Sequence, residues 1–193
     1  MARAAQPLRE IAVYSGSFDP LHIGHFSILE RLAALGRFHK TYLVVSPQSP
    51  FKEAQRALSA GARLRAARAA VRRHPGLNVL VSGIELGMEP PQYTIRTLDA
   101  LQARAPRTHF TLVIGGDQLD AFTRWRSYER ILLEYGLLVY PRRGYDSEAL
   151  RAALLRENPA YRIELLDAPL VDISSSRIRE LRGRGEDVSP YLM

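Results

Sequence analysis

Short runs of consecutive apolar residues alternate along the chain with longer segments in which apolar residues recur every three or four positions. Continuous apolar runs rich in branched side chains predict buried strands. Such runs occupy residues 11–15, 41–45, 77–81, 110–114 and 136–140, and a weaker, partly polar run occupies residues 162–166. The intervening segments have the spacing of amphipathic helices.

Strands that alternate with helices in this way predict an α/β fold. We expect a Rossmann-like, doubly wound parallel sheet of five to six strands with helices on both faces, because strands that are apolar throughout have both faces covered. The 193 residues suit one well-buried domain and are few for two. We therefore expect a single domain over residues 1–193, with a small C-terminal helical segment from about residue 172.

Residues that favour helix ends mark the expected boundaries. Gly36 predicts the end of the first helix, and Ser59 or Gly61 opens a helix that runs to Val71. The expected caps of the later helices are Thr94, Ser127, Asp146 and the serine run at 174–176.

The composition is ordinary for a globular protein, with 46% hydrophobic and 24% charged residues. No apolar run approaches the roughly 20 residues that cross a bilayer. The first residues lack an apolar core of signal-peptide length, and cysteine is absent. We therefore expect a cytoplasmic protein with no membrane partner.

The chain carries a formal net charge of +7, and Lys40 and Lys52 are the only lysines among its 27 basic residues. Such an excess of positive charge suits nucleic acid or a small polyanionic substrate. The densest basic patch consists of Arg63, Arg65, Arg68, Arg72 and Arg73. Because no aromatic residues interleave with this patch to stack on bases, we expect the solvated face of a helix and no nucleic-acid partner.

The stretch from Gly16 to His25 reads GSFDPLHIGH and joins the first predicted strand to a helix. His22 and His25 stand where that helix begins. The free N–H groups and partial positive charge of a helix N-terminus suit phosphate, and imidazoles beside it can donate to the same anion. Taken alone, the two histidines could also be one helix cap and one core residue. A zinc pair is disfavoured because no other ligand cluster completes four-coordination.

A second candidate anion site is the string ISSSRIR at residues 173–179. The hydroxyls of Ser174, Ser175 and Ser176 stand at a predicted helix start, and the Arg179 guanidinium can fork onto two phosphate oxygens. The alternative is ordinary helix capping beside a solvated arginine.

Further polar and aromatic residues follow the ends of predicted strands: Lys52 after the second, Tyr93 and Thr94 after the third, and Asp117 and Trp125 after the fourth. Ligands of open parallel sheets bind outside the carboxyl ends of the strands, so these residues are expected to gather at one edge. Taken singly, Lys52 could be solvated, Asp117 a cap and Trp125 a core residue.

Two of these strings resemble motifs of the nucleotidylyltransferase superfamily: GSFDPLHIGH resembles its signature, and ISSSRIR resembles its ISSTxIR motif with Ser176 in place of threonine. Other segments resemble nicotinate mononucleotide adenylyltransferases, namely SPQSPFKE at 46–53, PQYTIRTL at 91–98, IGGD at 114–117 followed by Trp125, and VYPRRGY at 139–145. The resemblance runs from about residue 10 to 190. It departs from the family at residues 15–17, at Arg143, where proline is usual, and at the C-terminus, where many relatives continue as a helix. This last departure leaves the oligomeric state open, a homo-oligomer included.

The resemblance implies adenylyl transfer from ATP to nicotinate mononucleotide in NAD biosynthesis, with Mg²⁺ arriving on ATP and no metal ligands from the protein. The implied catalytic residues are His22 and His25. The implied ATP-binding residues are Gly16, Phe18, His22, His25, Ser174, Ser175, Ser176 and Arg179. The implied mononucleotide-binding residues are Ser17, Lys52, Tyr93, Thr94, Gly116, Asp117, Trp125 and Arg142.

Other interpretations stay open. The same fold could act on nicotinamide mononucleotide or on phosphopantetheine. A non-catalytic nucleotide-binding protein is a second alternative, although the presence of both histidines argues against it. A nucleic-acid-binding protein is a third, and it would show a steep dependence of affinity on salt.

Overall fold

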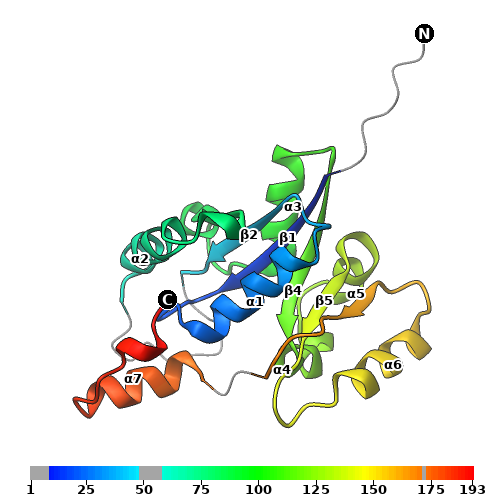
Figure 1. Ribbon diagram of the computed structural model, residues 1–193. Coiled ribbons are helices and arrows are strands. Elements are labelled where there is room, and N and C mark those ends of the chain that lie inside the picture. Colours follow the sequence, from blue (N-terminus) through cyan, green and yellow to red (C-terminus); the bar gives the residue numbers. More distant parts are fainter. Residues whose placement is uncertain (1–8, 48–57, 171–172) are drawn as a thin grey trace.

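The computed structural model describes residues 9–47, 58–170 and 173–193. In these residues six parallel strands form one sheet in the order β3-β2-β1-β4-β5-β6 (Figure 1). The strands are β1 (Arg9–Gly16), β2 (Lys40–Val45), β3 (Val79–Ser82), β4 (Thr108–Gly115), β5 (Leu137–Tyr140) and β6 (Ile163–Leu165). The predicted α/β fold is confirmed, and the weaker sixth strand is part of it.

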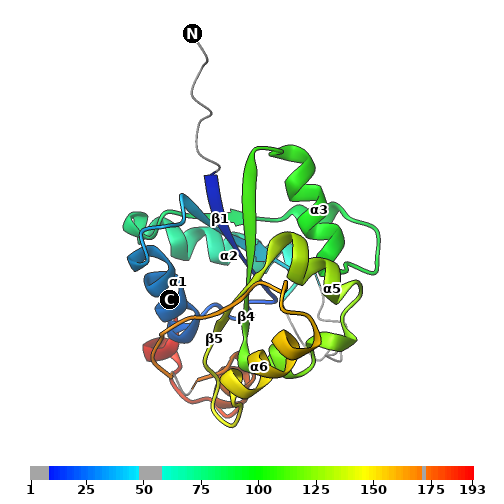
Figure 2. The same ribbon diagram turned by 90° about the vertical axis from the view of Figure 1, so that its right-hand side faces the viewer.

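Helices cover both faces of this sheet. Alternate residues of β1 enter separate cores, Ala12 and Tyr14 on one face and Ile11 and Val13 on the other. The first core is closed by α1 (Ile23–Ala34) and α2 (Ala60–Arg72), and the second by α3 (Thr94–Arg104), α5 (Tyr128–Arg130) with the π-helical turn Ile131–Tyr135, and α6 (Ser147–Glu157). Figure 2 shows α1 and α3 on opposite sides of β1 and β4.

The chain reverses its direction of travel across the sheet between β1 and β4. From β1 it passes through α1 and α2 to the edge strand β3, and α3 then carries it across the other face to β4, which pairs with β1. This is the switch point of a doubly wound sheet, where ligands bind beyond the carboxyl ends of the strands. The β1–α1 loop (residues 17–22) and α4 (Gly116–Asp120) follow the two strands that meet there.

Three local predictions are wrong for reasons of backbone geometry. The third strand begins at Val79 rather than Leu77, because Pro75–Leu77 forms a 3₁₀ turn and Asn78 takes a left-handed φ of 50°. Ser127 also lies in the left-handed region, with φ of 56°, and its side chain caps no helix. Thr94 is the first helical residue of α3, and Tyr93 occupies the cap position without a side-chain hydrogen bond. The predicted caps Ser59, Asp146 and Ser174 are confirmed.

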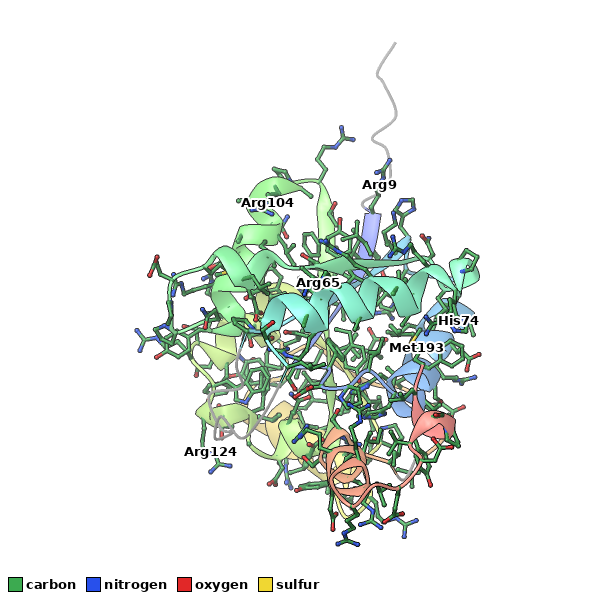
Figure 3. All side chains as sticks on the ribbon, turned by 90° about the vertical axis from the view of Figure 1, so that its left-hand side faces the viewer. Arg9, Arg65, His74, Arg104, Arg124 and Met193 are labelled. Atoms are coloured by element: carbon green, nitrogen blue, oxygen red, sulfur yellow. The ribbon has the colours of Figure 1, made fainter. Side chains whose placement is uncertain are left out.

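The basic patch on α2 is solvated at four of its five arginines. Arg65, Arg68, Arg72 and Arg73 are exposed, and Figure 3 shows Arg65 on the outer side of this helix. Arg63 is buried, with 4% of its surface exposed. The prediction that all five form a solvated face is therefore wrong at Arg63.

The C-terminal residues return to the start of α1. Ile178 and Leu181 of helix α7 (Ser175–Gly183) form a small separate core with Val188, which follows the helix. Beyond it, Leu192 forms an antiparallel bridge with His22, and Arg73 donates to the carbonyl oxygen of Met193 at 2.6 Å. Figure 3 shows Met193 beside the end of α2, near His74.

Candidate active site

His22 is the N-terminal cap of α1. Its Nδ1 accepts a hydrogen bond from the backbone N–H of Gly24 at 3.1 Å, and only 4% of the residue is exposed. Burial, assisted by the positive charge of Arg142, lowers the pKa of His22 to about 4. The ring is therefore neutral near pH 7. Because Nδ1 is an acceptor, the proton is on Nε2, which can donate to a ligand.

His25 stacks on His22, with ring centroids 3.7 Å apart and an angle of 32° between the planes. Its Nδ1 accepts from the backbone N–H of His22 at 3.2 Å, which closes a reciprocal capping box at the start of α1. Gly24 between them leaves little space for a side chain, since a Cβ there would lie 3.0 Å from the His22 ring and the ring would have to shift slightly. The HIGH string therefore fixes two imidazoles that both accept through Nδ1.

The Phe18 ring packs against His25 of this pair. This ring is buried and meets the His25 ring edge to face at 5.0 Å and the Tyr14 ring at 5.4 Å. The residue adopts a left-handed φ of 45°. Gly16 accommodates the same ring, because a Cβ at Gly16 would approach it to 3.1 Å. What Phe18 offers a ligand is thus its backbone, while its side chain positions His25.

The start of α7 is bonded to the β1–α1 loop, although some 155 positions separate them in sequence. Ser175 donates from Oγ to the carbonyl of Pro20 at 3.1 Å. Arg179 donates to the carbonyl of Asp19 at 2.7 Å and to Ser176 Oγ at 3.1 Å. Ser174 caps the helix by accepting from the N–H of Arg177. The structure therefore brings the two predicted anion sites together.

The predicted residues after β4 and β5 also meet. Arg142 donates from Nε to Asp117 Oδ1 at 3.3 Å, and its guanidinium lies over the Tyr140 ring, 5.6 Å from the centroid. Gly116 opens α4 where a Cβ would lie 2.6 Å from Ser147 Oγ. Glycine at this position thus permits the close approach of α6.

Two hollows lie between these groups. A narrow one is lined by both histidines with Tyr14, Tyr140 and Arg142. A cavity of about 510 Å³ extends from Asp117 and Arg142 to Ser174, and Arg143 and Arg177 also line it. Three arginines on one cavity make it suited to a polyanion such as a nucleotide triphosphate.

Sequence reasoning missed Tyr14, Tyr140, Arg143 and Arg177 as lining residues. A signal existed for three of them, because Tyr140 and Arg143 belong to the VYPRRGY segment after a predicted strand and Arg177 to the serine-run motif. Nothing in the pattern of β1 separates Tyr14 from an ordinary core residue.

Five predicted mononucleotide residues among the described ones line neither hollow: Ser17, Tyr93, Thr94, Gly116 and Trp125. Ser17 is half-buried in the β1–α1 loop, and Tyr93 is 44% exposed at the start of α3. Trp125 is half-buried and packs on Phe122 with ring centroids 5.0 Å apart. Lys52 lies outside the described residues.

Neither a membrane helix nor a metal cluster is found in the part of the chain that the structure describes. No helix there is long and apolar enough to span a bilayer. No group of three or more histidine, aspartate or glutamate side chains there could hold a metal ion by itself.

Comparison with known proteins agrees with this geometry. A family model described as cytidylyltransferase-like matches residues 13–181. A protein of Cytophaga hutchinsonii is 37% identical over 89% of this chain and 85% of its own length, and one of Bacteroides fragilis is 34% identical over 93% and 85%. Both are named probable nicotinate-nucleotide adenylyltransferases. The chain belongs to this cytidylyltransferase-like family.

Solved structures support the fold independently. Nicotinic acid mononucleotide adenylyltransferase of Plasmodium falciparum, solved in complex with NaAD, superposes with a TM-score of 0.78 at 19% identity, covering 95% of this chain and 90% of its own. A second structure of that protein, in complex with APC, gives a TM-score of 0.75 over the same shares. The chain thus shares its fold with a protein that has been solved with NaAD and with APC bound. On this fold lie the two histidines, the start of α7 and the arginine-lined cavity.

Proposed function

We propose that the protein transfers the adenylyl group of ATP to nicotinate mononucleotide, forming nicotinate adenine dinucleotide and pyrophosphate in NAD biosynthesis. The observation that carries this proposal is the pair of stacked histidines beside an arginine-lined cavity, each oriented at the start of α1 by a backbone N–H that donates to its Nδ1. The names of the similar proteins from Cytophaga hutchinsonii and Bacteroides fragilis supply the substrate.

In the proposed reaction a phosphate oxygen of the mononucleotide attacks the α-phosphorus of ATP in line. A new P–O bond forms, the bond from the α-phosphorus to the bridging oxygen breaks, and pyrophosphate leaves with that electron pair. The attacking phosphate is already ionised near neutral pH, so no protein nucleophile or strong base is required. Such reactions are accelerated by positioning and by stabilisation of charge in the transition state.

His22 and His25 are assigned to that stabilisation. Their Nδ1 atoms are occupied by backbone N–H groups. The Nε2–H of the neutral His22 is thus a fixed donor for oxygens of the reacting phosphates. A donor that is already oriented costs no reorganisation when charge develops.

We assign ATP to the side of the site between α1 and α7. Ser174, Ser175, Ser176 and Arg179 would hold the β- and γ-phosphates, and the backbone at Gly16 and Phe18 would lie along the nucleotide. Arg179 is already oriented by its bonds to Asp19 and Ser176, which supports this assignment. Mg²⁺ is proposed to enter with ATP, bound to triphosphate oxygens and water, where it neutralises negative charge.

The mononucleotide is assigned to residues that follow β1, β2, β3, β4 and β5 in sequence. These are Ser17, Lys52, Tyr93, Thr94, Gly116, Asp117, Trp125 and Arg142. The ion pair between Asp117 and Arg142 supports the placement, because Arg142 lines the hollow beside the histidines as well as the larger cavity, which Asp117 also lines. Trp125, which is half-buried and packs on Phe122, is assigned to stack on the pyridine.

The decisive test offers the purified protein Mg²⁺–ATP with nicotinate mononucleotide, nicotinamide mononucleotide or phosphopantetheine, and follows pyrophosphate together with the nucleotide product. We expect the highest kcat/KM with nicotinate mononucleotide, and no turnover by a variant that lacks both histidines. A preference for either other acceptor would replace the proposed substrate. No turnover with any acceptor would contradict the enzymatic function.

A further inference from the structure

Arg63 is a buried cation whose hydrogen bonds join separate loops. It donates from Nε to the carbonyl of Leu58 at 3.1 Å, from Nη2 to that of Pro47 at 2.6 Å, and from Nη1 to that of Ser46 at 2.8 Å. Nη1 also donates to the carbonyl of Ser17. The four acceptors are backbone oxygens from the β1–α1 loop, from the residues after β2 and from the entry to α2.

A guanidinium in this position is costly for the fold. Burial lowers the pKa of Arg63, and the nearby carboxylate of Asp19 offsets only part of that effect. All of its hydrogen bonds in the described residues go to neutral carbonyls. If this turn of α2 contributed only apolar packing, leucine or methionine there would stabilise the fold more than a buried arginine.

The joined backbone lies at the carboxyl ends of β1 and β2. There Ser46 N donates to the carbonyl of Gly16 at 2.9 Å, and the hydroxyls of Ser15 and Ser46 are 3.0 Å apart. Ser17 is the residue that turns from β1 toward His22. A shift of the Ser17 carbonyl therefore moves the start of the loop that ends at His22, on the side facing β2 rather than α7.

We propose that Arg63 is a positioning residue for the mononucleotide subsite: its guanidinium holds the Ser17 backbone against the loop that follows β2, and so sets the affinity for the acceptor substrate. This inference rests on the proposed function. It concerns the acceptor and not ATP, because the ATP side of the β1–α1 loop is held independently by Ser175 and Arg179.

The test compares steady-state kinetics of the full-length wild-type protein, Arg63→Lys, Arg63→Met and Arg63→Ala with both substrates varied. Arg68→Met and Arg68→Ala are matched controls, because Arg68 is an exposed arginine on the same helix. A lysine keeps the charge but cannot reach separate carbonyls with a planar fork. We expect Arg63→Lys to raise KM for nicotinate mononucleotide about tenfold and to leave KM for ATP within about twofold, as loss of one or two charge-assisted hydrogen bonds predicts.

Chemical rescue separates positioning from general loss of structure. Guanidinium ion at a non-denaturing millimolar concentration should raise the kcat/KM of Arg63→Ala for the mononucleotide about threefold or more. It can occupy the space that the side chain leaves and offer the same donors. Methylammonium should give no such rise, and neither cation should affect the Arg68 variants. Melting temperatures of all variants are measured alongside.

Each outcome decides the proposal. Equal rises in both KM values, or unchanged kinetics with a lower melting temperature, would overturn it. If Arg63→Ala and Arg63→Met do not fold, Arg63→Lys decides alone, and failure of Arg63→Lys to fold would show that Arg63 serves the fold itself. A wild-type protein without turnover would contradict the proposed function, whereas an active wild type with a normal Arg63→Lys variant would contradict only this inference.

Discussion

Arg179 on α7 donates from Nη1 to the backbone carbonyl of Asp19 across 2.7 Å, although 160 positions separate the two residues in sequence. With the Ser175–Pro20 bond, this contact fixes the last helix against the loop that presents His22. The N-terminal part of α7 is thereby bonded to the loop that leads into α1, and the N-terminus of each helix carries a partial positive charge.

Substitution of Arg179 should weaken ATP more than the mononucleotide. Arg179→Ala removes both the phosphate ligand and the bond to Asp19, so we expect kcat/KM for ATP to fall about 10²-fold, and Arg179→Lys to recover only part of it. Initial rates with each substrate varied in turn measure the effect. Arg182→Ala, at an exposed position of the same helix, is the control. An unchanged KM for ATP in Arg179→Ala would remove this residue from the ATP site.

His22 should make the protein less stable in mild acid. Its pKa is about 4 in the folded protein, against an ordinary value of 6.5. Between these values the unfolded chain binds a proton at this residue that the folded chain does not, so the free energy of unfolding falls as pH drops from about 6.5 to about 4, by up to about 3 kcal/mol.

The variant His22→Asn isolates this effect. Asparagine can keep the cap by accepting from the Gly24 N–H, but it does not titrate. The difference in unfolding free energy between pH 7 and pH 4.5, measured with urea, should therefore be smaller for the variant than for the wild type. Equal differences in the two proteins would mean that His22 titrates normally.

His25 should matter for the rate far more than for folding. Its neighbours Phe18 and Tyr14 fill the space around the ring, so His25→Ala is expected to fold, while the loss of a transition-state donor lowers kcat by about 10²-fold or more. His39→Ala, at an exposed residue just before β2, is the matched control. A kcat for His25→Ala within about threefold of wild type contradicts the assigned role.

The buried side chain of Glu85 offers a test of stability. Thr97 donates from Oγ1 to Glu85 Oε1 at 2.8 Å, and the two residues are 1% and 3% exposed. Thr97→Val keeps the shape but removes a buried hydrogen bond and leaves its acceptor without that donor, so the free energy of unfolding should fall by about 1–3 kcal/mol. Thr97→Ser retains the hydroxyl and should lose less. Urea titrations of the three proteins provide the comparison, and equal losses in both variants would assign the effect to packing.

The strands of the sheet could be predicted from the sequence because they are continuous apolar runs buried on both faces. Residues that favour turns or helix ends bound each run. The sequence was also sufficient for the caps Ser59, Asp146 and Ser174, whose signal is local. It failed at Asn78 and Ser127, where left-handed backbone is taken up by residues other than glycine. Helical periodicity and residue type alone do not determine such conformations.

The burial of Arg63 could not be predicted from the sequence, for a different reason. By spacing alone Arg63 is one of four arginines on α2, and arginines are mostly exposed in proteins. Its burial depends on carbonyl oxygens of Ser17, Ser46 and Pro47, which other loops bring to it. The position of the two histidines at the start of α1 was predictable because their backbone partners are two and three residues away, whereas the partners of Arg63 are dispersed along the chain.

The bridge between Leu192 and His22 has a practical consequence for every experiment above. A purification tag attached after Met193 would be anchored next to the backbone of His22 and could crowd the substrates. Arg9 starts β1 at the opposite end of the sheet from the carboxyl ends of the strands (Figure 1). Recombinant protein should therefore carry its tag ahead of Arg9, or have it cleaved before kinetics are measured.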